Sequence, residues 1–422
     1  MNTHQPLPKS SYFAWIMWIV GASFYFYEFL LQVFPNVVAH HLMEQLAVSA
    51  AALGGIQAAY FIGYGFMQAP AGMLLDRFGP RKLLTIAVIL CGLGAIIFAK
   101  STNVYQAEIT RFITGFGSAF ALVGALVLAS RWFPANRFAL LNGLIITIGM
   151  LGAAAGEAPF GLLVQKYDWQ HIIVTLGFVG LVLGAIIYLV VRDYPKGQTM
   201  VSHKPEGVSA FSGIVNIFFC KQSWLIALYG SFMFASTPAL GTLWGSSFLE
   251  TTRGLPAITA DSIITVLFIG WAVGAPLFGA LSDRIGRRKP SLYMGSIGAF
   301  IFILLFIYQP HVSVTMLKCY MFLFGFFCGG FIVSFSVIRE SHPWHFSGTS
   351  LGFMNLVNTV GAAASPLLVG ILLDTYWDGT MVNHVQVFSA ATYYKAITIL
   401  PIFVGLSLLI LPFIKETYCK GK

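Results

Sequence analysis

The sequence predicts an all-α integral membrane protein with twelve transmembrane helices, arranged as two pseudo-symmetric six-helix bundles. Of its 422 residues, 57% are hydrophobic and only 9% are charged, whereas a soluble domain has about 45–50% apolar and about 25% charged residues. Apolar stretches of about 20 residues, the length that crosses a bilayer, recur along the whole chain. One charged motif also occurs twice, once in each half. These observations exclude a water-soluble protein.

Twelve apolar segments account for most of the chain. Hydropathy predicts helices at residues 12–38, 48–74, 83–99, 104–130, 138–163, 170–192, 222–249, 261–281, 290–308, 313–338, 347–373 and 390–414. The first segment is too long, and too often interrupted by polar residues, for a signal peptide. We therefore expect it to be retained as the first membrane helix.

The basic residues indicate how these helices are oriented. With the amino terminus inside, eighteen of the 24 Lys and Arg residues lie in predicted inner loops and tails, and three lie in outer loops. By the positive-inside rule, both termini are predicted to be cytoplasmic, and we expect a bacterial inner membrane. The net charge of +9 then reflects topology, and no nucleic-acid partner is expected.

Cofactor, metal and enzyme chemistry have no signal in the sequence. The five cysteines show no metal or redox spacing, so we expect neither a disulfide nor a metal site. The chain has no attached soluble domain and no grouped His and Asp near a membrane interface. We expect no cofactor and no enzymatic activity.

A block of residues is repeated along the chain. The segment GMLLDRFGPRK at residues 72–82 recurs 207 residues later as GALSDRIGRRK at residues 279–289, with seven of eleven positions identical. Arg111 corresponds to Lys318 at the same offset. The repeat predicts a six-helix unit at residues 1–192, a cytoplasmic linker at 193–221 and a second six-helix unit at 222–422.

Twelve helices, a central inner connection and the paired Gly-x-x-x-Asp-Arg-x-Gly motif resemble the major facilitator superfamily over nearly the whole chain. The segment RFITG at residues 111–115 is similar to the family's Arg-x-x-x-Gly motif in helix four. The resemblance implies two domains that close alternately over a central site, without ATP. No phosphate-binding Gly-x-x-x-x-Gly-Lys-Ser/Thr loop occurs, so an ion or substrate gradient must supply the energy.

The repeated motif supplies the predicted cytoplasmic gate. Its residues are Gly72, Asp76, Arg77, Gly79 and Arg81 in one half, and Gly279, Asp283, Arg284, Gly286 and Arg288 in the other. We expect the first glycine of each copy to let helices approach closely and the second to allow a tight turn. By the resemblance, each Asp makes its contact only when the inner side is closed, which latches the outward-open state. The alternative is a simple basic anchor at the inner surface.

Charged residues inside predicted helices are candidate functional residues, because each costs about 2.5–3.5 kcal/mol on insertion scales. The deepest are Glu28, Arg111 and Glu157. Glu28 belongs to a small or polar stripe on the first helix, which should face protein or water rather than lipid. We predict Glu28 and Glu157 to be proton-coupling residues.

Similar stripes on other helices predict a substrate-binding site at the centre of the molecule. Its expected residues are Tyr25, Gln32, Gln57, Tyr60, Tyr64, Arg111, Trp244, Lys318, Asn355 and Asn358. An alternative for the amides is that they only join helices by hydrogen bonds, and for Trp244 that it only packs against its neighbours.

Four of the charged residues have a structural alternative. Glu28 takes up and releases a proton, or it forms a permanent ion pair with Arg111. Arg111 suits a substrate carboxylate or phosphate, unless Glu108, one helical turn away, neutralises it. Lys318 adds a second cation from the other half, or it extends to the outer surface. Glu157 is a second protonation site, or a buried acid satisfied by one hydrogen bond.

These features predict a secondary active transporter. We expect proton-coupled import of a small polar metabolite, such as an organic anion, amino acid or peptide, by a protein that acts as a monomer in the bilayer. The alternative is a proton-coupled exporter of drugs or siderophores. Antiporters of the family typically carry a Gly-Pro pair where this chain has Glu157-Ala158-Pro159, which weakens that alternative. A polytopic membrane enzyme or receptor is the alternative of a different class.

Overall fold

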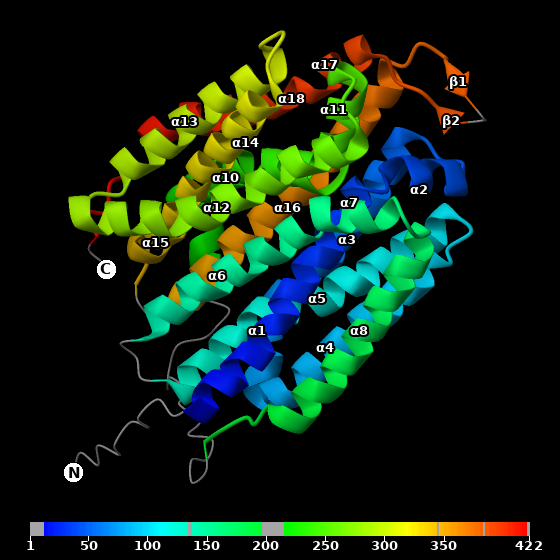
Figure 1. The fold of residues 1–422 in the computed structure, drawn as a ribbon. Helices are drawn as coiled ribbons and strands as arrows, with labels where there is room; N and C mark the ends of the chain where they lie inside the picture. The colour runs from blue at the N-terminus through cyan, green and yellow to red at the C-terminus, as the bar shows by residue number, and fades with distance from the viewer. Residues whose placement is uncertain (1–11, 134–136, 196–214, 344–345, 383–384, 420–422) are drawn as a thin grey trace, which may run out of the picture.

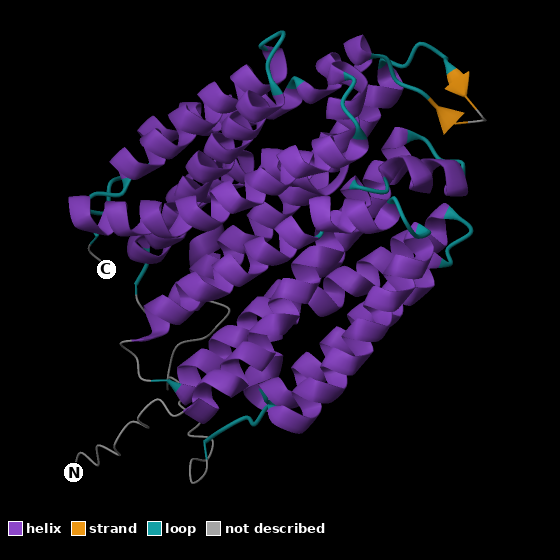
Figure 2. Ribbon diagram, viewed as in Figure 1, coloured by secondary structure: helices purple, strands orange, loops and turns teal. Residues whose placement is uncertain are grey.

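The computed structural model describes residues 12–133, 137–195, 215–343, 346–382 and 385–419. This part of the chain is almost entirely helical (Figure 2), and twelve of its segments are long and apolar enough to cross a membrane. The prediction of an all-α membrane protein with twelve spanning helices in two related bundles is confirmed. The exact domain limits stay a prediction, and residues 196–214 of the expected linker lie outside the described residues.

The first half contains the helices that precede the linker. They are α1 (Tyr12–Val33), the short η1 (Phe34–Asn36), α2 (Ala39–Leu46), α3 (Ala50–Phe78), α4 (Pro80–Ala99), α5 (Val104–Trp132), α6 (Phe138–Ala155), α7 (Ala158–Val164) and α8 (Trp169–Val190). The fifth spanning segment is broken between α6 and α7, at Gly156 and Glu157.

The second half repeats this plan. It contains α10 (Lys221–Ala239), η3 (Leu240–Trp244), α11 (Gly245–Arg253), α12 (Ala257–Ile285), α13 (Lys289–Tyr308), α14 (Val314–Cys328), η4 (Gly329–Phe331), α15 (Ile332–Ser341), α16 (Ser347–Thr375), α17 (Ala390–Ile397), α18 (Ile399–Ile410) and η6 (Leu411–Phe413). A small antiparallel pair, β1 (Met381–Val382) and β2 (Val385–Gln386), follows α16.

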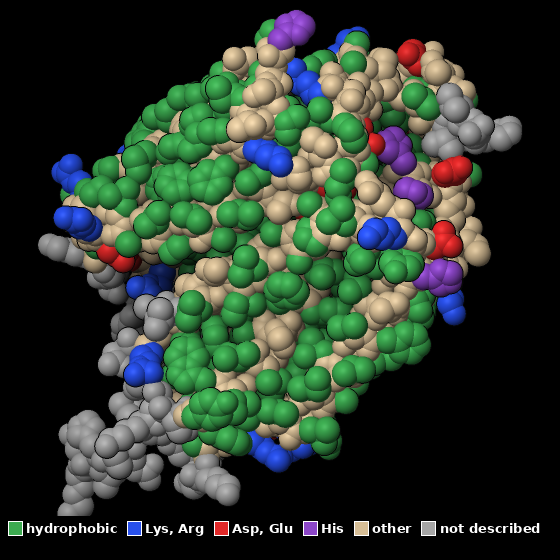
Figure 3. Space-filling model, in the orientation of Figure 1, with side chains coloured by type: hydrophobic (Ala, Val, Ile, Leu, Met, Phe, Trp, Pro, Cys, Tyr) green, Lys and Arg blue, Asp and Glu red, His purple; other side chains and the backbone are tan. Residues whose placement is uncertain are grey.

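The start of α1 and the last described residues, after η6, lie at the same end of the helical bundle, which we call the termini end (Figure 1). The opposite, distal end carries α2, α17 and the strands β1 and β2 (Figure 1). Hydrophobic side chains cover most of the helical flanks between the two ends (Figure 3). An apolar surface of this kind is stable in contact with lipid. The polar groups of the backbone need no water there, because they are hydrogen-bonded within the helices.

The two halves pack together mainly through α3 with α16 and through α6 with α12. Small residues allow the first contact: a Cβ added to Gly54 would lie 2.8 Å from the Cα of Leu367, and one added to Gly370 would lie 2.4 Å from the carbonyl oxygen of Ala50. Asp374 of α16 accepts hydrogen bonds from the backbone N–H groups of Ala50 and Ala51, at 3.1 and 2.9 Å. The carboxylate thereby satisfies the start of α3 across the interface.

The predicted boundaries of the repeated motif are corrected by the structure. The sequence segments at 48–74 and 261–281 were expected to end within the first residues of the motif, but α3 continues to Phe78 and α12 to Ile285. The helices continue because residues 75–78 and 282–285 contain no Gly or Pro, and they end at Gly79 and Gly286, which have φ angles of +83° and +71°. Those two glycines make the turns, since L side chains rarely adopt this conformation.

A close crossing of α3 and α5 provides a test of packing inside the first half. A Cβ at Gly115 would lie 1.9 Å from the carbonyl oxygen of Tyr60, so we expect Gly115→Ala to destabilise the protein by about 1–3 kcal/mol through overpacking. Thermal unfolding in detergent measures this change. Gly143→Ala in α6 is the matched control, because its Cβ would meet nothing within 4 Å. Equal unfolding temperatures for both variants would contradict the packing described here.

Candidate functional site

A small cavity lies between the two halves. Its lining comes from five spanning segments and includes Phe29, Gln32, Phe61, Met150, Phe234, Thr237, Pro238, Thr242, Phe268 and Trp271. Its volume is about 40 Å³, which holds one or a few water molecules. Trp271 donates a hydrogen bond to the Thr237 hydroxyl at 3.1 Å. Of the predicted substrate-binding residues, Gln32 lines this cavity.

Glu28 lies in α1 with its carboxyl group buried, at 1% exposure. The Tyr60 hydroxyl donates a hydrogen bond to Glu28 Oε1 at 2.5 Å, and Glu28 Oε2 has no partner. The ring of Tyr64 stacks on that of Tyr60 at 6.4 Å between centroids. The structure therefore brings together three predicted residues around one carboxyl group that is shielded from water.

Arg111 of α5 is also buried, at 1% exposure. Its guanidinium donates to the carbonyl oxygen of Leu31 at 2.7 Å and to Gln57 Oε1 at 2.7 Å, and it lies 4.6 Å from the centre of the Tyr60 ring. A cation at this place satisfies the carbonyl groups at the carboxyl end of α1. Gln57 in turn donates to the carbonyl oxygen of Gln32 at 3.1 Å.

The two ion-pair alternatives for Arg111 are not realised in this structure. Among the described residues, neither Glu28 nor Glu108 lies within ion-pair distance of the guanidinium. The Glu108 carboxylate instead lies close to Gly55 of α3. Among the described residues, Arg111 is therefore a buried cation that is bound by neutral oxygen atoms and lies against three aromatic rings, those of Phe34, Tyr60 and Phe98. It is not part of the cavity lining.

Tyr25, Asn355 and Asn358 were also predicted to bind the substrate. Tyr25 is buried, and its ring packs on Phe29. Asn358 is 2% exposed, and its amide nitrogen and oxygen have no hydrogen-bond partner. Asn355 is half-buried on the same helix.

Two of the predicted substrate residues are removed from the cavity lining. Trp244 donates a hydrogen bond to the carbonyl oxygen of Pro366 at 2.8 Å, which fixes its indole against α16. Lys318 lies in the second turn of α14, near the distal end, and is half-buried. Neither side chain lines the cavity, so this structure gives them no contact with a substrate at that place.

The repeated motif forms a carboxylate cap at the termini end of each half. In the first half, the Arg81 backbone N–H donates to Asp193 Oδ1 at 2.9 Å, and the Arg81 side chain donates to the carbonyl oxygen of Tyr188 at 2.7 Å. In the second half, the N–H groups of Arg288 and Lys289 donate to Glu416 at 2.8 and 2.9 Å. Each cap joins the end of a bundle's last spanning helix to the start of its third.

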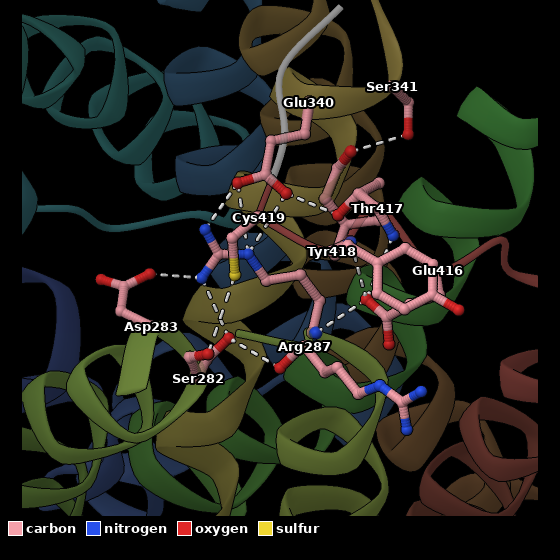
Figure 4. Close-up of polar contacts among 11 residues, drawn as sticks. Ser282, Asp283, Arg287, Glu340, Ser341, Glu416, Thr417, Tyr418 and Cys419 are labelled. Atoms are coloured by element: carbon pink, nitrogen blue, oxygen red, sulfur yellow. Dashed lines mark hydrogen bonds and ion pairs between the residues drawn. The ribbon is translucent and has the colours of Figure 1, made fainter. Parts of the chain in front are cut away.

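The second half adds a denser ion network to its cap (Figure 4). Arg288 pairs with Glu340 and with Asp283, each at 2.5 Å. The Thr417 hydroxyl donates to Glu340 at 2.5 Å. In the first half α5 ends at Trp132, whose indole donates to the carbonyl oxygen of Arg192 at 3.0 Å. In both caps a carboxylate accepts hydrogen bonds from backbone N–H groups, but the second cap contains more charged side chains.

In this structure the gate residues make contacts other than those expected, and their role as a latch stays a prediction. A Cβ at Gly72 or at Gly279 would meet nothing within 4 Å, so these glycines do not mediate a close helix approach in this structure. Asp283 pairs with Arg288 of its own half, so its contact does not require the two halves to meet. The side chain of Asp76 lies outside the described residues. Arg77 and Arg284 lie in the last turns of α3 and α12, and Gly286 directly follows α12.

The Glu416 cap predicts a pH-dependent contribution to stability. Partial burial acts to raise the pKa of Glu416, but hydrogen bonds from the backbone N–H groups of Arg288 and Lys289 outweigh it and lower the pKa below its ordinary value. A lowered carboxyl pKa stabilises the fold above the unfolded pKa, and this stabilisation is lost as the pH falls through the folded pKa.

We therefore expect Glu416→Gln to lower the unfolding temperature near neutral pH. The difference from the wild type should shrink as the pH falls below about 4.5, the ordinary pKa of this group. Thermal unfolding in detergent at a series of pH values measures it. Glu44→Gln, at an exposed position of α2, is the control. A difference that does not depend on pH would show that Glu416 acts only through packing.

A buried polar cluster closes the distal end, and we call its four residues, Asn36, Glu157, Ser246 and Asp261, the distal cluster. The Asn36 amide donates to Glu157 Oε2 at 2.8 Å and to the Ser246 hydroxyl at 3.0 Å. The Ser246 hydroxyl donates to Asp261 Oδ1 at 2.6 Å, and the Ser246 N–H donates to Asn36 Oδ1 at 3.2 Å. All four residues are at most 2% exposed.

The sequence matches the family model of the Major Facilitator Superfamily over residues 16–366 and 239–417. The chain belongs to the major facilitator superfamily. Its relatives include a probable sulfoacetate transporter of Cupriavidus necator, 23% identical over 83% of this chain and 85% of the relative. A probable galactarate/D-glucarate transporter of Escherichia coli is 23% identical over 80% and 83%. A membrane sensor protein of Escherichia coli is 22% identical over 91% and 90%.

The fold of this facilitator is also found in solved structures. A bacterial homologue of the human lysosomal transporter Spinster, in an inward-facing and occupied conformation, has a TM-score of 0.79 and 15% sequence identity. The match covers 96% of this chain and 97% of the other. The family assignment makes this protein a multi-pass membrane transporter and not an enzyme.

Sequence reasoning missed several polar residues of this facilitator. Asp261 and Glu416 were absent from the predicted site, although both are acidic residues at or near the end of a predicted helix. Asn36 had no signal, because a single Asn in the last turn of a predicted helix, here residues 12–38, is ordinary. The available signal was acidity at helix ends, where a carboxylate can reach the start of a neighbouring helix.

Proposed function

We propose that this protein is a proton-coupled symporter that imports a small organic anion by alternating access. The observation that supports it is the arrangement of Glu28, Tyr60 and Arg111. The Tyr60 ring lies next to the Arg111 guanidinium, and its hydroxyl is bonded to Glu28. One acid and one permanent cation are thus buried side by side without direct pairing.

The charge of this group depends on the proton of Glu28. When Glu28 is ionised, its negative charge offsets the positive charge of Arg111 at a distance. When Glu28 is protonated, the group carries the uncompensated charge of Arg111, which is always present. In a low-dielectric interior such a charge attracts an anion strongly. A proton and an organic anion would therefore bind together, and they would cross the membrane together.

The relatives support an anionic substrate. Two of them are named for the transport of sulfoacetate and of galactarate or D-glucarate, and these compounds carry sulfonate or carboxylate groups. Unpaired donors near the centre of this protein suit such groups, and the amide of Asn358 is the clearest of them, since it is buried and makes no hydrogen bond. We propose Asn358 and Gln32 as substrate contacts.

The termini end is proposed to be cytoplasmic in a bacterial inner membrane. The junctions of α3 with α4 and of α12 with α13, both at this end, carry basic residues in the turns and the adjoining helix ends: Arg77, Arg81 and Lys82, and Arg284, Arg287, Arg288 and Lys289. A cytoplasmic location agrees with the positive-inside rule. Between described residues, the hydrogen bonds that join the two halves all lie toward the opposite, distal end. The structure then corresponds to a state that is closed toward the outside.

Uptake by the purified protein in liposomes tests the proposal. Galactarate, D-glucarate and sulfoacetate are offered with an inward proton gradient, with no gradient, and with the gradient collapsed by a protonophore. Glucose and lysine serve as neutral and cationic comparisons. We expect accumulation of at least one anion, by up to about tenfold for each unit of pH gradient, because one unit corresponds to about 1.4 kcal/mol.

Other outcomes would replace this proposal. Accumulation against the direction of proton flow would favour an exporter. Binding of an anion without any flux, by the intact protein, would favour a sensor, the activity named for one relative. Equal uptake of neutral and anionic compounds would exclude the proposed role of the charge on Arg111.

A further inference from the structure

The distal cluster places two carboxyl groups, one from each half, in an interface that is shielded from bulk solvent. Glu157 stands at the break between α6 and α7, with an exposed fraction of 0%, and Asp261 is in the second turn of α12, at 2%. A Cβ added to Gly161 of α7 would lie 2.3 Å from Asp261 Oδ2, so the Asp261 carboxyl group lies directly against the other half.

The charges around the two carboxyl groups do not neutralise them. Among the described residues, no Lys, Arg or His forms an ion pair with either. Asn36 from η1 and Ser246 from α11 bind the two carboxyl groups, the Thr265 hydroxyl donates to the backbone carbonyl of Asp261, and the acidic Glu250 of α11 lies near Asp261. Each of these four neighbours is neutral or acidic. Removing two ionised carboxylates from water without a cation costs several kcal/mol for each ion.

Glu157 also has an oxygen atom without a hydrogen-bond donor. Its Oε2 accepts from Asn36, whereas Oε1 is fully buried and has no hydrogen-bond partner among the residues that the structure describes. An ionised carboxylate would leave a charged oxygen unsatisfied in a buried interface, which is costly. A carboxylic acid needs fewer donors, because one of its oxygens carries the proton. The arrangement therefore fits a protonated cluster.

The cluster belongs to an interface that must separate during transport. Asn36 and Glu157 belong to the first half, Ser246 and Asp261 to the second, and hydrogen bonds join them directly. The Ala158 N–H adds a bond to the Thr265 hydroxyl at 3.1 Å, beside the cluster. If the halves separate at the distal end, both carboxyl groups come into contact with water and can ionise.

We propose that the distal cluster is a protonation site, and that the distal end closes only after Glu157 or Asp261 has taken up a proton from the outer solution. The inference rests on alternating access in the proposed function. The carboxylate and one proton form the carboxylic acid on closing, and the proton returns to the same solution on reopening. Closure thus consumes an outer proton, separately from any proton that Glu28 carries across the membrane.

Distance measurements between spin labels at the distal end test this inference. Cysteines replace Thr102 and His311, exposed residues in the loops α4–α5 and α13–α14, in a background without native cysteines. The distance distribution is recorded from about pH 5 to about pH 9 without substrate. We expect the ratio of open to closed molecules to rise with pH in the wild type, by up to about tenfold per unit.

The test compares two amide variants, one in each half, with the wild type. Glu157→Gln and Asp261→Asn keep the shape of the side chain but cannot ionise, so each should hold the distal end closed over the whole pH range. Asp168→Asn, an exposed acid at the same end, should respond to pH as the wild type does. Gel filtration and thermal unfolding of each variant show that it is folded.

A wild-type pH response in both amide variants would overturn the inference. So would a response that follows sodium concentration at constant pH, because the cluster would then bind a metal cation. If the distal end opens as the pH rises but the protein shows no proton-driven uptake, the inference is supported and the proposed function is contradicted. If uptake is proton-driven but the distal end does not respond to pH, the proposed function is supported and the inference is contradicted.

Discussion

Replacing Glu28 by Gln is expected to abolish uptake driven by a proton gradient and to leave exchange of substrate across the membrane intact. The amide keeps the size of the side chain and can still accept the hydrogen bond from Tyr60, but it cannot take up or release a proton. The site would then carry the charge of Arg111 permanently, as if Glu28 were always protonated. Substrate should bind and exchange but not accumulate.

Two assays on liposomes with the purified variant separate these effects. Gradient-driven uptake should fall by about tenfold for each unit of pH gradient applied, to the level without a gradient. Counterflow, in which labelled substrate exchanges for unlabelled substrate, should stay near the wild-type rate. Glu108→Gln is the matched control, because its half-buried carboxylate lies in the same membrane region without contact to Tyr60. Unchanged accumulation in Glu28→Gln would remove Glu28 from the mechanism.

Replacing Arg111 by Ala is expected to weaken both the fold and the binding of anions. The change leaves the carbonyl oxygen of Leu31 and the Gln57 amide without their donor. Each unsatisfied buried group costs about 1–3 kcal/mol, so a loss of about 2–5 kcal/mol of stability is expected. The central charge that would attract an anion is lost at the same time.

Arg111→Lys distinguishes the two roles. Lysine keeps the charge but cannot reproduce the fork that reaches Leu31 and Gln57 together. We expect it to unfold at a lower temperature than the wild type and to keep a preference for anions over neutral compounds in counterflow. Arg339→Ala, an exposed position of α15, is the control for loss of a positive charge. An Arg111→Ala variant with wild-type stability and wild-type anion preference would contradict both roles.

The difference between the two halves at the centre has a structural consequence. By the offset of the repeat, Glu28 of the first half corresponds to the neighbourhood of Thr237 in the second, and Thr237 lines the cavity beside Trp271. The acid and the buried cation thus belong to the first half, while the second half contributes hydroxyl, amide and aromatic groups. The two bundles share one fold, but the acid and the cation that are proposed to couple substrate to protons both lie in the first.

The sequence by itself determined the architecture and the kind of protein. Long apolar segments force helices in a bilayer, because every backbone polar group must be satisfied internally. A repeat with a constant offset requires two similar units, and both turn glycines, Gly79 and Gly286, have the positive φ angles that such turns need. These properties depend on local composition and spacing, which the sequence contains directly.

Only the tertiary structure decided which charged groups meet. Arg111 and Glu108 are close in sequence, yet Arg111 binds the end of α1 and Glu108 turns toward α3. Glu157 and Asp261 lie on different halves, and Asn36 and Ser246 join them in one buried cluster. Such contacts depend on the rotation and crossing of helices far apart in the chain. Helical periodicity shows which residues share one face of a helix. The packing of the helices decides which other residues that face contacts.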